Sequence, residues 1–346
     1  MNKNSESIEQ LSPAYFALVM ATGIVSIAAS LFGIAWFPHT LLYLNILCYT
    51  GLVLAYTVRW FRYRKNVIAD LTDHAKSPGY LTFVAATNVL GVQIFVLMKA
   101  VAVSAIMLGI GVISWCILIY LFFGLVIAKE SKPPIERAIS GVWLLTVVST
   151  QSVSVLLTQL AAHLPIPMEI SLFLSLMLYL CGCMFYIILI TLIMYRLVFF
   201  TLTADQFAPP YWINMGAVAI TTLSGSLLLL QKESWMFLGE ISPFLVGFTL
   251  LFWSVGTWWI PLVFFLGLWR HLNQKVPFEY HPQYWGMVFP MGMYTVSTVR
   301  LSQAIQYSWL LAVADKFVWI AIVLWAIVFG GMVVSFYRTL RALFRP

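Results

Sequence analysis

Residues that could carry chemistry are few in this sequence, and they lie at the edges of long apolar stretches. The histidines fall at such edges or between them: His39, His74, His163, His271 and His281. The nearest acidic residues, Glu169, Asp205 and Glu240, are also at boundaries. No His cluster, Cys/His pair or carboxylate dyad lies inside an apolar stretch, so catalysis has no candidate nucleophile, metal or general base. The sequence therefore indicates a protein that is not an enzyme, without a cofactor or a metal site.

Arg300 differs from the other charged residues because it lies well inside an apolar stretch. A charge there is costly and is usually paired or faces water. It follows Phe289 by eleven residues, which is close to three helical turns and about 16 Å along the axis. Both side chains are therefore expected on one helix face, where Arg300 could draw anions toward a pore. The alternative is that Arg300 snorkels to the membrane surface or pairs with an acidic loop residue.

The composition explains why chemistry is so sparse. Of 346 residues, 62% are hydrophobic and 9% are charged, whereas a soluble domain carries roughly 25% charged residues. Apolar runs long enough to cross ~30 Å of hydrocarbon recur along the chain. This excludes a soluble enzyme, a nucleic-acid-binding protein and a disordered chain. The sequence indicates an all-α polytopic membrane protein whose partner is the lipid bilayer.

Ten transmembrane helices are expected, joined as five hairpins. The expected spans are 13–36, 40–58, 78–98, 102–128, 137–160, 169–199, 210–231, 243–269, 284–307 and 316–338. Because the connections are short, residues 13–338 are expected to form a single transport domain. Residues 1–12 and 339–346 would be N-terminal and C-terminal tails.

The basic residues predict the orientation of these spans. The net charge is +7, and fifteen of the nineteen lysines and arginines would lie on one side of the ten-span arrangement. Lysine and arginine are enriched in cytoplasmic loops. We therefore expect both termini in the cytoplasm and the chain in the plasma membrane (the cell inner membrane), with no nucleic-acid partner.

A short motif recurs at the start of the odd-numbered spans. Pro-x-Tyr is found at Pro13, Pro78, Pro209 and Pro282, and Pro134 marks a version without the tyrosine. Proline suits a first helical turn, and tyrosine suits the membrane interface. Each copy is thus explained by a helix start with an anchor, but the recurrence indicates a repeated hairpin. Parallel repeats are most simply arranged as a ring around a central pore, with the odd helices inside.

The repeat also aligns the inner helices in depth. Seven residues after each proline come Met20, Ala85, Gly141, Gly216 and Phe289. Small residues at this level would leave room for Phe289 to plug the axis. Pro290, directly after it, is expected to kink the helix. Alternatively, Phe289 packs between helices.

Several polar residues within the spans could line a pore. They are Thr22, Thr87, Asn88, Thr146 and Thr222. Such side chains also bond back to their own helix or join neighbouring helices. Both interpretations are open at this point.

Three segments resemble a known family. Ser12–Gly23, Ala208–Gly216 and Tyr284–Tyr294 are similar to the first, seventh and ninth helices of the tellurite-resistance/dicarboxylate-transporter (TDT) family. This family includes bacterial TehA proteins, fungal malate and sulfite transporters, and plant slow anion channels. The resemblance implies ten helices in a pseudo-five-fold ring, a homotrimer, and anion passage through a central pore. It also implies that Phe289, followed by Pro290, occludes that pore.

The sequence leaves two modes of transport open. No chain of buried acids or histidines indicates a proton relay, which favours a passive anion channel. The alternative is a proton-coupled C4-dicarboxylate (malate) carrier, or an exporter of sulfite or tellurite oxyanions.

Overall fold

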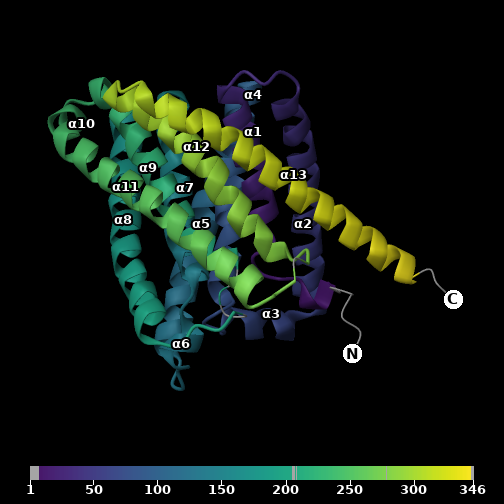
Figure 1. Ribbon diagram of the computed structural model, residues 1–346. Coiled ribbons are helices and arrows are strands. Elements are labelled where there is room, and N and C mark those ends of the chain that lie inside the picture. Colours follow the sequence, from purple (N-terminus) through teal and green to yellow (C-terminus); the bar gives the residue numbers. More distant parts are fainter. Residues whose placement is uncertain (1–7, 205–206, 208, 278, 344–346) are drawn as a thin grey trace.

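The computed structural model describes residues 8–204, 207, 209–277 and 279–343, and all regular structure within them is helical (Figure 1). The long helices are α1 (Ala17–Leu31), α2 (Phe37–Arg62), α4 (Leu81–Met98), α5 (Val101–Ala128), α7 (Leu145–Leu160), α8 (Met168–Phe199), α9 (Ile213–Leu230), α11 (Ser242–Leu268), α12 (Trp285–Ile305) and α13 (Trp309–Leu343). Short helices are α3 (Arg64–Leu71), α6 (Ile135–Ala138) and α10 (Met236–Glu240). The expected tails lie partly outside the described residues, which include neither 1–7 nor 344–346.

Eight of the described helices are long and apolar enough to cross a membrane. The chain is therefore a multi-pass, all-helical membrane protein. Two expected spans are not among the eight: α1 is apolar but has 15 residues, and α12 carries Arg300 and several hydroxyl side chains. α13 begins at Trp309, seven residues before the expected span, and it includes Asp315 and Lys316, which form an exposed ion pair.

A tight turn precedes each of four buried helices. These 3₁₀ turns are η2 (Ser77–Tyr80), η3 (Gly141–Leu144), η5 (Pro209–Trp212) and η8 (Pro282–Tyr284), which lead into α4, α7, α9 and α12. Three contain the repeat proline, whose missing N–H needs no partner at a helix start. In η3 the Ser140 hydroxyl instead accepts the Val142 N–H, at 3.4 Å. The entry to the fifth span is therefore at Gly141, seven residues after the expected Pro134.

Burial divides the long helices into two classes. Within an apolar 18-residue window of the spans 209–230 and 141–163, 94% and 89% of residues are buried, against 17% in the window of the span 37–62. α1, α4, α7, α9 and α12 form the buried class, whereas α2, α5, α8, α11 and α13 expose large apolar side chains. Apolar side chains facing outward suit a lipid environment, so the second class forms the lipid-facing layer.

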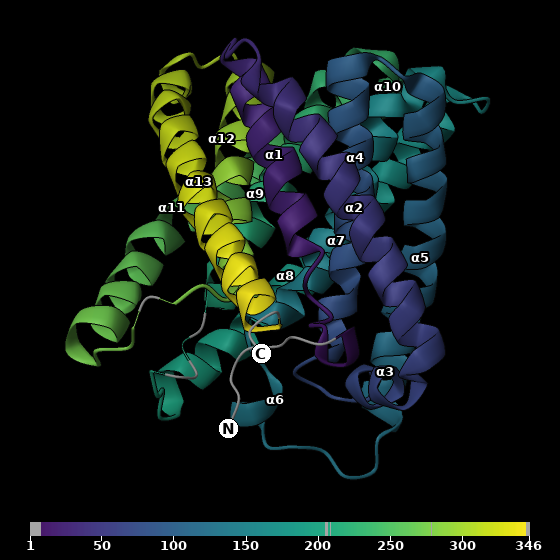
Figure 2. The same cartoon turned by 90° about the vertical axis from the view of Figure 1, so that its right-hand side faces the viewer.

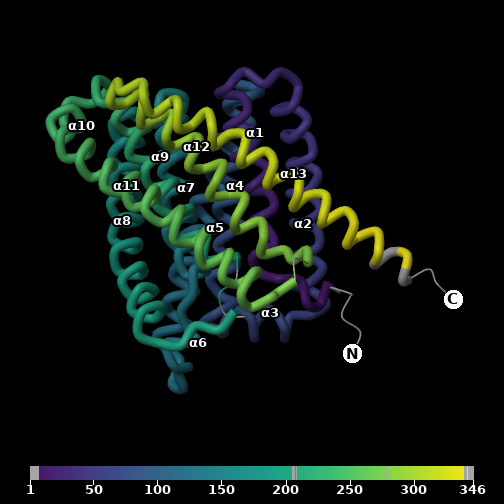
Figure 3. The backbone as a smooth tube through the Cα atoms, viewed as in Figure 1, coloured from purple at the N-terminus to yellow at the C-terminus, as the bar shows by residue number. Residues whose placement is uncertain are grey.

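The buried helices pack side by side in chain order. α1 contacts α4, α4 contacts α7, α7 contacts α9, and α9 contacts α12, which in turn contacts α1. Each lipid-facing helix packs on two consecutive buried helices: α2 on α1 and α4, α5 on α4 and α7, α8 on α7 and α9, α11 on α9 and α12, and α13 on α12 and α1. Figure 2 shows α2, α5, α11 and α13 outside this inner group. Figure 3 traces the backbone through the same helices from the N-terminus to the C-terminus.

Candidate functional site

Two small cavities lie between the five buried helices, and each is lined by residues from all five. α1 contributes Ala17 and Met20 to the first cavity, then Ile24 and Ile27 to the second. α7 repeats the pattern with Leu145 and Val148, then Ser152 and Val155. Steps of three, four and three residues keep side chains on one helical face. Each stripe therefore runs from one cavity to the other, and we call the line between the helices that joins the two cavities the axial path.

Phe289 lies where the first cavity ends. Its ring lines that cavity, and Met293, one turn further along α12, lines the second. Phe289 is only 2% exposed. The cavities have volumes of about 30 Å³ and 10 Å³, and a single water needs ≳ 10–15 Å³. There is room for one or two waters, so the path is closed to a hydrated ion.

Three of the residues expected at the level of Phe289 lie on this path or beside it. Met20 lines the first cavity with Phe289. A Cβ atom on Gly216 would lie 2.8 Å from Pro290 Cγ and 3.6 Å from Phe289 Cδ1, so the absence of a side chain admits the Phe-Pro pair. Ala85 is fully buried and follows Thr82, a lining residue, by three positions.

Gly141 does not lie at this level. It packs against the carbonyl of Pro210 in the entry turns, and Val148 occupies the corresponding place in the cavity wall. The expected register of the fifth span was wrong because it was counted from Pro134, which precedes the separate short helix α6.

The polar residues expected to line a pore mostly point elsewhere. Thr222 and Thr146 donate to backbone carbonyls of Val218 and Trp143 on their own chain segment. Thr22 accepts from the indole of Trp325 on α13, and Thr87 pairs with Tyr49 on α2. The hydroxyls of these four threonines thus bond within and between helices, and the four residues do not line either cavity.

Asn88 also bonds back to its own helix, donating to the carbonyl of Val84 at 2.9 Å, but it differs from the threonines in lining a cavity. It lines the second cavity, and its amide donates to Ser152, a lining residue on α7, at 3.2 Å. Its Oδ1 is buried without a hydrogen-bond partner. This pair places polar atoms on an otherwise apolar wall.

Arg300 continues the face of α12 that carries Phe289 and Met293. Its guanidinium is partly buried and donates to Gln303 Oε1 at 2.8 Å, one turn further along. Ion pairs among the described residues do not include it. The sequence expectation of a shared face is consistent with this placement, at the end of α12 away from the entry turns.

A repeated basic clamp, which sequence reasoning missed, holds the entry turns. At the end of α2, Arg59 donates through Nε to the carbonyl of Glu9 at 3.1 Å and through Nη1 to the Tyr80 hydroxyl at 3.1 Å. At the end of α8, Arg196 donates in the same way to the carbonyl of Glu136 at 3.1 Å and to the Tyr211 hydroxyl at 2.6 Å. Each arginine thus ties its own hairpin to the tyrosine of the next.

Two further hairpins contain part of this clamp. Arg270, after α11, donates to the carbonyl of Phe207 at 2.5 Å, and Lys129, after α5, donates to that of Thr72 at 3.0 Å. The signal was visible as a basic residue at the end of each lipid-facing span. From the sequence alone, this basic residue indicates only a cytoplasmic loop, and the repeat tyrosine only an interfacial anchor.

Within the described residues, no group of three or more His, Cys, Asp or Glu side chains could hold a metal ion. The site offers a narrow, mainly apolar path with one polar pair and one cation beyond it. Such walls suit passage of an ion more than its tight binding.

Comparison with known proteins gives one matching family model, described as voltage-dependent anion channel (SLAC1), over residues 10–333. An uncharacterized membrane protein of Mycobacterium tuberculosis is 33% identical over 147 residues, covering 42% of this chain and 74% of the relative. Two uncharacterized transporters of Methanocaldococcus jannaschii are 24% and 23% identical, covering 84% and 92% of both chains respectively. The match extends over all five hairpins.

Proposed function

The chain belongs to the voltage-dependent anion channel (SLAC1) family, and from this premise we propose that it conducts small anions through the path between its five buried helices. Membership makes the protein a membrane anion channel or transporter rather than an enzyme. The finer proposal concerns where the anion passes and what closes the path.

The proposed architecture is ten spans, as five hairpins, in a pseudo-five-fold ring. α1, α4, α7, α9 and α12 form the inner wall. The cyclic order of their contacts supports this arrangement, as does the placement of each lipid-facing helix on two neighbours. α1 and α12 are included although they fall short of the length or hydropathy expected of a span. Other helices cover their faces, so they need not be as apolar as a helix that is surrounded by lipid.

The proposed gate is Phe289, supported by Pro290. One observation carries the proposal: stripes from all five helices line two cavities of about 30 Å³ and 10 Å³, and Phe289 lies between them. Met20, Ala85, Val148 and Gly216 complete the wall at that level. Arg300 lies beyond the second cavity, where its positive charge would raise the local anion concentration.

The proposed orientation places both termini in the cytoplasm of a cell whose plasma membrane holds the protein. The basic loops and the clamp residues Arg59 and Arg196 lie at the end where α1 begins and α13 ends (Figure 2). This agrees with the enrichment of lysine and arginine in cytoplasmic loops. Lys3 and Arg345, also assigned to this side, are outside the described residues. The likeness to the TDT family further suggests a homotrimer.

Flux measurements on the purified protein in liposomes test this proposal. Chloride, nitrate, malate and sulfite are compared, with and without a pH gradient, in wild type and in Phe289→Ala. We expect ohmic anion currents in the variant, with reversal potentials that follow the anion gradient. Saturating uptake driven by the pH gradient would favour the carrier instead, and cation-selective currents would refute anion passage. Sulfite flux that runs only outward, whatever the direction of the sulfite gradient, would favour the oxyanion exporter.

A further inference from the structure

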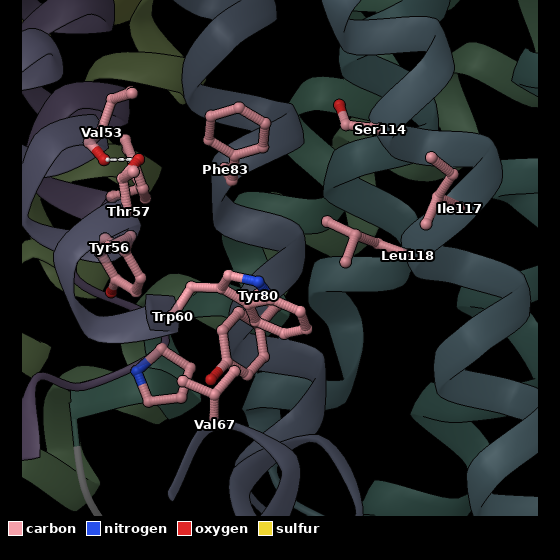
Figure 4. A pocket seen from close by; sticks show the side chains of 12 residues that line it. Val53, Tyr56, Thr57, Trp60, Val67, Tyr80, Phe83, Ser114, Ile117 and Leu118 are labelled. Atoms are coloured by element: carbon pink, nitrogen blue, oxygen red, sulfur yellow. Dashed lines mark hydrogen bonds between the residues drawn. The ribbon is translucent and has the colours of Figure 1, made fainter. Parts of the chain in front are cut away.

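A large groove lies on the lipid-facing surface rather than on the axis. It has a volume of about 440 Å³, within the ~300–1,000 Å³ range of ligand sites. Figure 4 shows α2 residues Val53, Thr57 and Trp60 along one side and Ile117 and Leu118 of α5 along the other. Tyr80 of η2 and Phe83 of α4 lie between them.

The lining is chemically graded. Most of it is apolar, as an acyl chain requires, and its outer residues include Ile117, which is 59% exposed, and Trp60, which is 43% exposed. Toward the entry-turn end, the rings of Tyr56 and Tyr80 add hydroxyl groups. Such rings, with an apolar body and a polar tip, favour the depth of lipid headgroups.

A basic rim borders that same end. Arg62, Arg64 and Lys65 are exposed at the junction of α2 and α3. The Arg64 guanidinium lies 5.5 Å above the ring of Trp60, which itself lines the groove. α3 reaches the groove through Val67 and lies across the end of the bundle (Figure 2).

The neighbouring acidic groups do not neutralise this rim. Asp70 is buried and already paired with Arg59 at 2.6 Å and with Lys76 at 3.0 Å. Glu9 keeps its negative charge, because its partner Asn66, at 3.1 Å, is an uncharged amide. The three exposed cations Arg62, Arg64 and Lys65 outnumber this carboxylate, so the net charge at the mouth of the groove is positive.

We propose that this groove binds an anionic phospholipid of the membrane, with one acyl chain between α2 and α5 and the headgroup phosphate at Arg64 and Lys65. Charge complementarity selects this occupant over a neutral lipid, since each basic residue near an anionic headgroup favours binding by about fivefold.

The bound lipid would brace the entry to the axial path. Tyr56 donates its hydroxyl to the carbonyl of Ser12, and Ser12 lines the first cavity. Tyr80 accepts from Arg59 of the basic clamp. Two residues of the groove wall therefore hold segments that border the path. This site is independent of which ion passes, because its residues do not line either cavity.

Native mass spectrometry of the full-length protein in detergent tests the proposal, with dioleoyl-phosphatidylglycerol and dioleoyl-phosphatidylcholine as probes. We expect the anionic lipid to be retained at least about tenfold more tightly than the neutral one. Arg64→Gln with Lys65→Gln should weaken retention of the anionic lipid about thirtyfold. The matched control, Arg137→Gln with Lys275→Gln, also removes two exposed basic residues but away from the groove, and should leave retention unchanged.

Bulky substitutions in the groove wall distinguish a lipid bound in this groove from lipid bound elsewhere on the protein. Thr57→Trp should remove the retained lipid, whereas Thr57→Val, which keeps the volume, should not. Ile117→Trp, from the opposite wall, gives the same test if Thr57→Trp fails to fold. Equal retention of both lipids, equal loss in the charge pair and its control, or unchanged retention in both filled variants would overturn the proposal. A change of oligomeric mass in the filled variants without lipid loss would also overturn it, and would assign the groove to a second copy of this chain. None of these outcomes depends on anion conduction.

Discussion

Removing the ring of Phe289 should open the axial path, and the size of the effect can be estimated from its packing. The ring is 2% exposed and lies against Gly216 and the wall of a 30 Å³ cavity. Truncating a buried phenylalanine to alanine costs about 3–5 kcal/mol. A conducting path requires the ring to leave this position, so the loss falls on the closed state. At about 1.4 kcal/mol per factor of ten, Phe289→Ala should raise the open-to-closed ratio roughly one hundred- to several thousand-fold.

The assay is single-channel recording in planar bilayers, with chloride as the permeant anion and open probability as the readout. The matched control is Phe252→Ala on α11. Phe252 is equally buried, at 2% exposed, and packs against the rings of Tyr186 and Phe248 instead of the axis. It carries a similar packing loss without touching the path, so its open probability should match wild type.

A second substitution places an aromatic ring in the same cavity from another helix. Val148 lines the same cavity from α7, and Val148→Phe in the Phe289→Ala background should close the path again. The reasoning fails if Phe289→Ala opens no more often than Phe252→Ala. It also fails if the added ring at position 148 leaves the current of Phe289→Ala unchanged.

Three further predictions concern charged groups. Arg300→Gln, in the Phe289→Ala background, should lower chloride conductance at about 10 mM salt and not at about 1 M, where the screening length falls from ~30 Å to ~3 Å; salt-independent conductance ratios would contradict steering. Arg59→Met should destabilise the protein by about 1.5–3 kcal/mol, because it removes the shorter of the two charged hydrogen bonds to buried Asp70. Exposed Arg62→Met should cost under ~0.5 kcal/mol, and denaturant unfolding that gives equal losses would contradict the clamp. Burial, together with Lys129 and Lys132, lowers the pKa of His74 below its value of ~6.5 in the unfolded chain. The folded state is therefore fully stable with respect to this group above that pH. It loses stability as the pH falls, because the unfolded chain binds the proton more readily. His74→Gln should therefore flatten the fall in melting temperature between pH 7.5 and 5.5, and an unchanged slope would exclude His74 as its source.

The sequence predicts the helices well wherever local chemistry decides. Proline at a first turn marks the starts of α4, α9 and α12, because that position needs no N–H donor. It misplaces α7, since a serine cap and Gly141 perform the same role without a proline. The three- and four-residue spacing of lining residues would place Val148 in the cavity wall, but only if the first residue of α7 were already known.

Contacts between hairpins could not be read from the sequence. The threonines look like candidates for a pore wall until their neighbours are known, and in the structure Thr146 and Thr222 satisfy their hydroxyls on the preceding turn. The basic clamp joins residues up to 63 positions apart, as in Arg270 and Phe207. No local pattern specifies such a partner.

The contact between α1 and α12 bears on how the protein is made. It joins the first hairpin to the last, as does the hydrogen bond from Trp325 to Thr22, which spans 303 positions. During translation, one flank of α1 therefore stays uncovered until the ribosome has delivered the final hairpin. With 15 residues, α1 is about 22 Å long, short of the ~30 Å hydrocarbon layer. A nascent chain halted after α11 would therefore hold an open-sided bundle, in which α2 and α4 cover one flank of α1 while the flank that α12 and α13 cover stays bare.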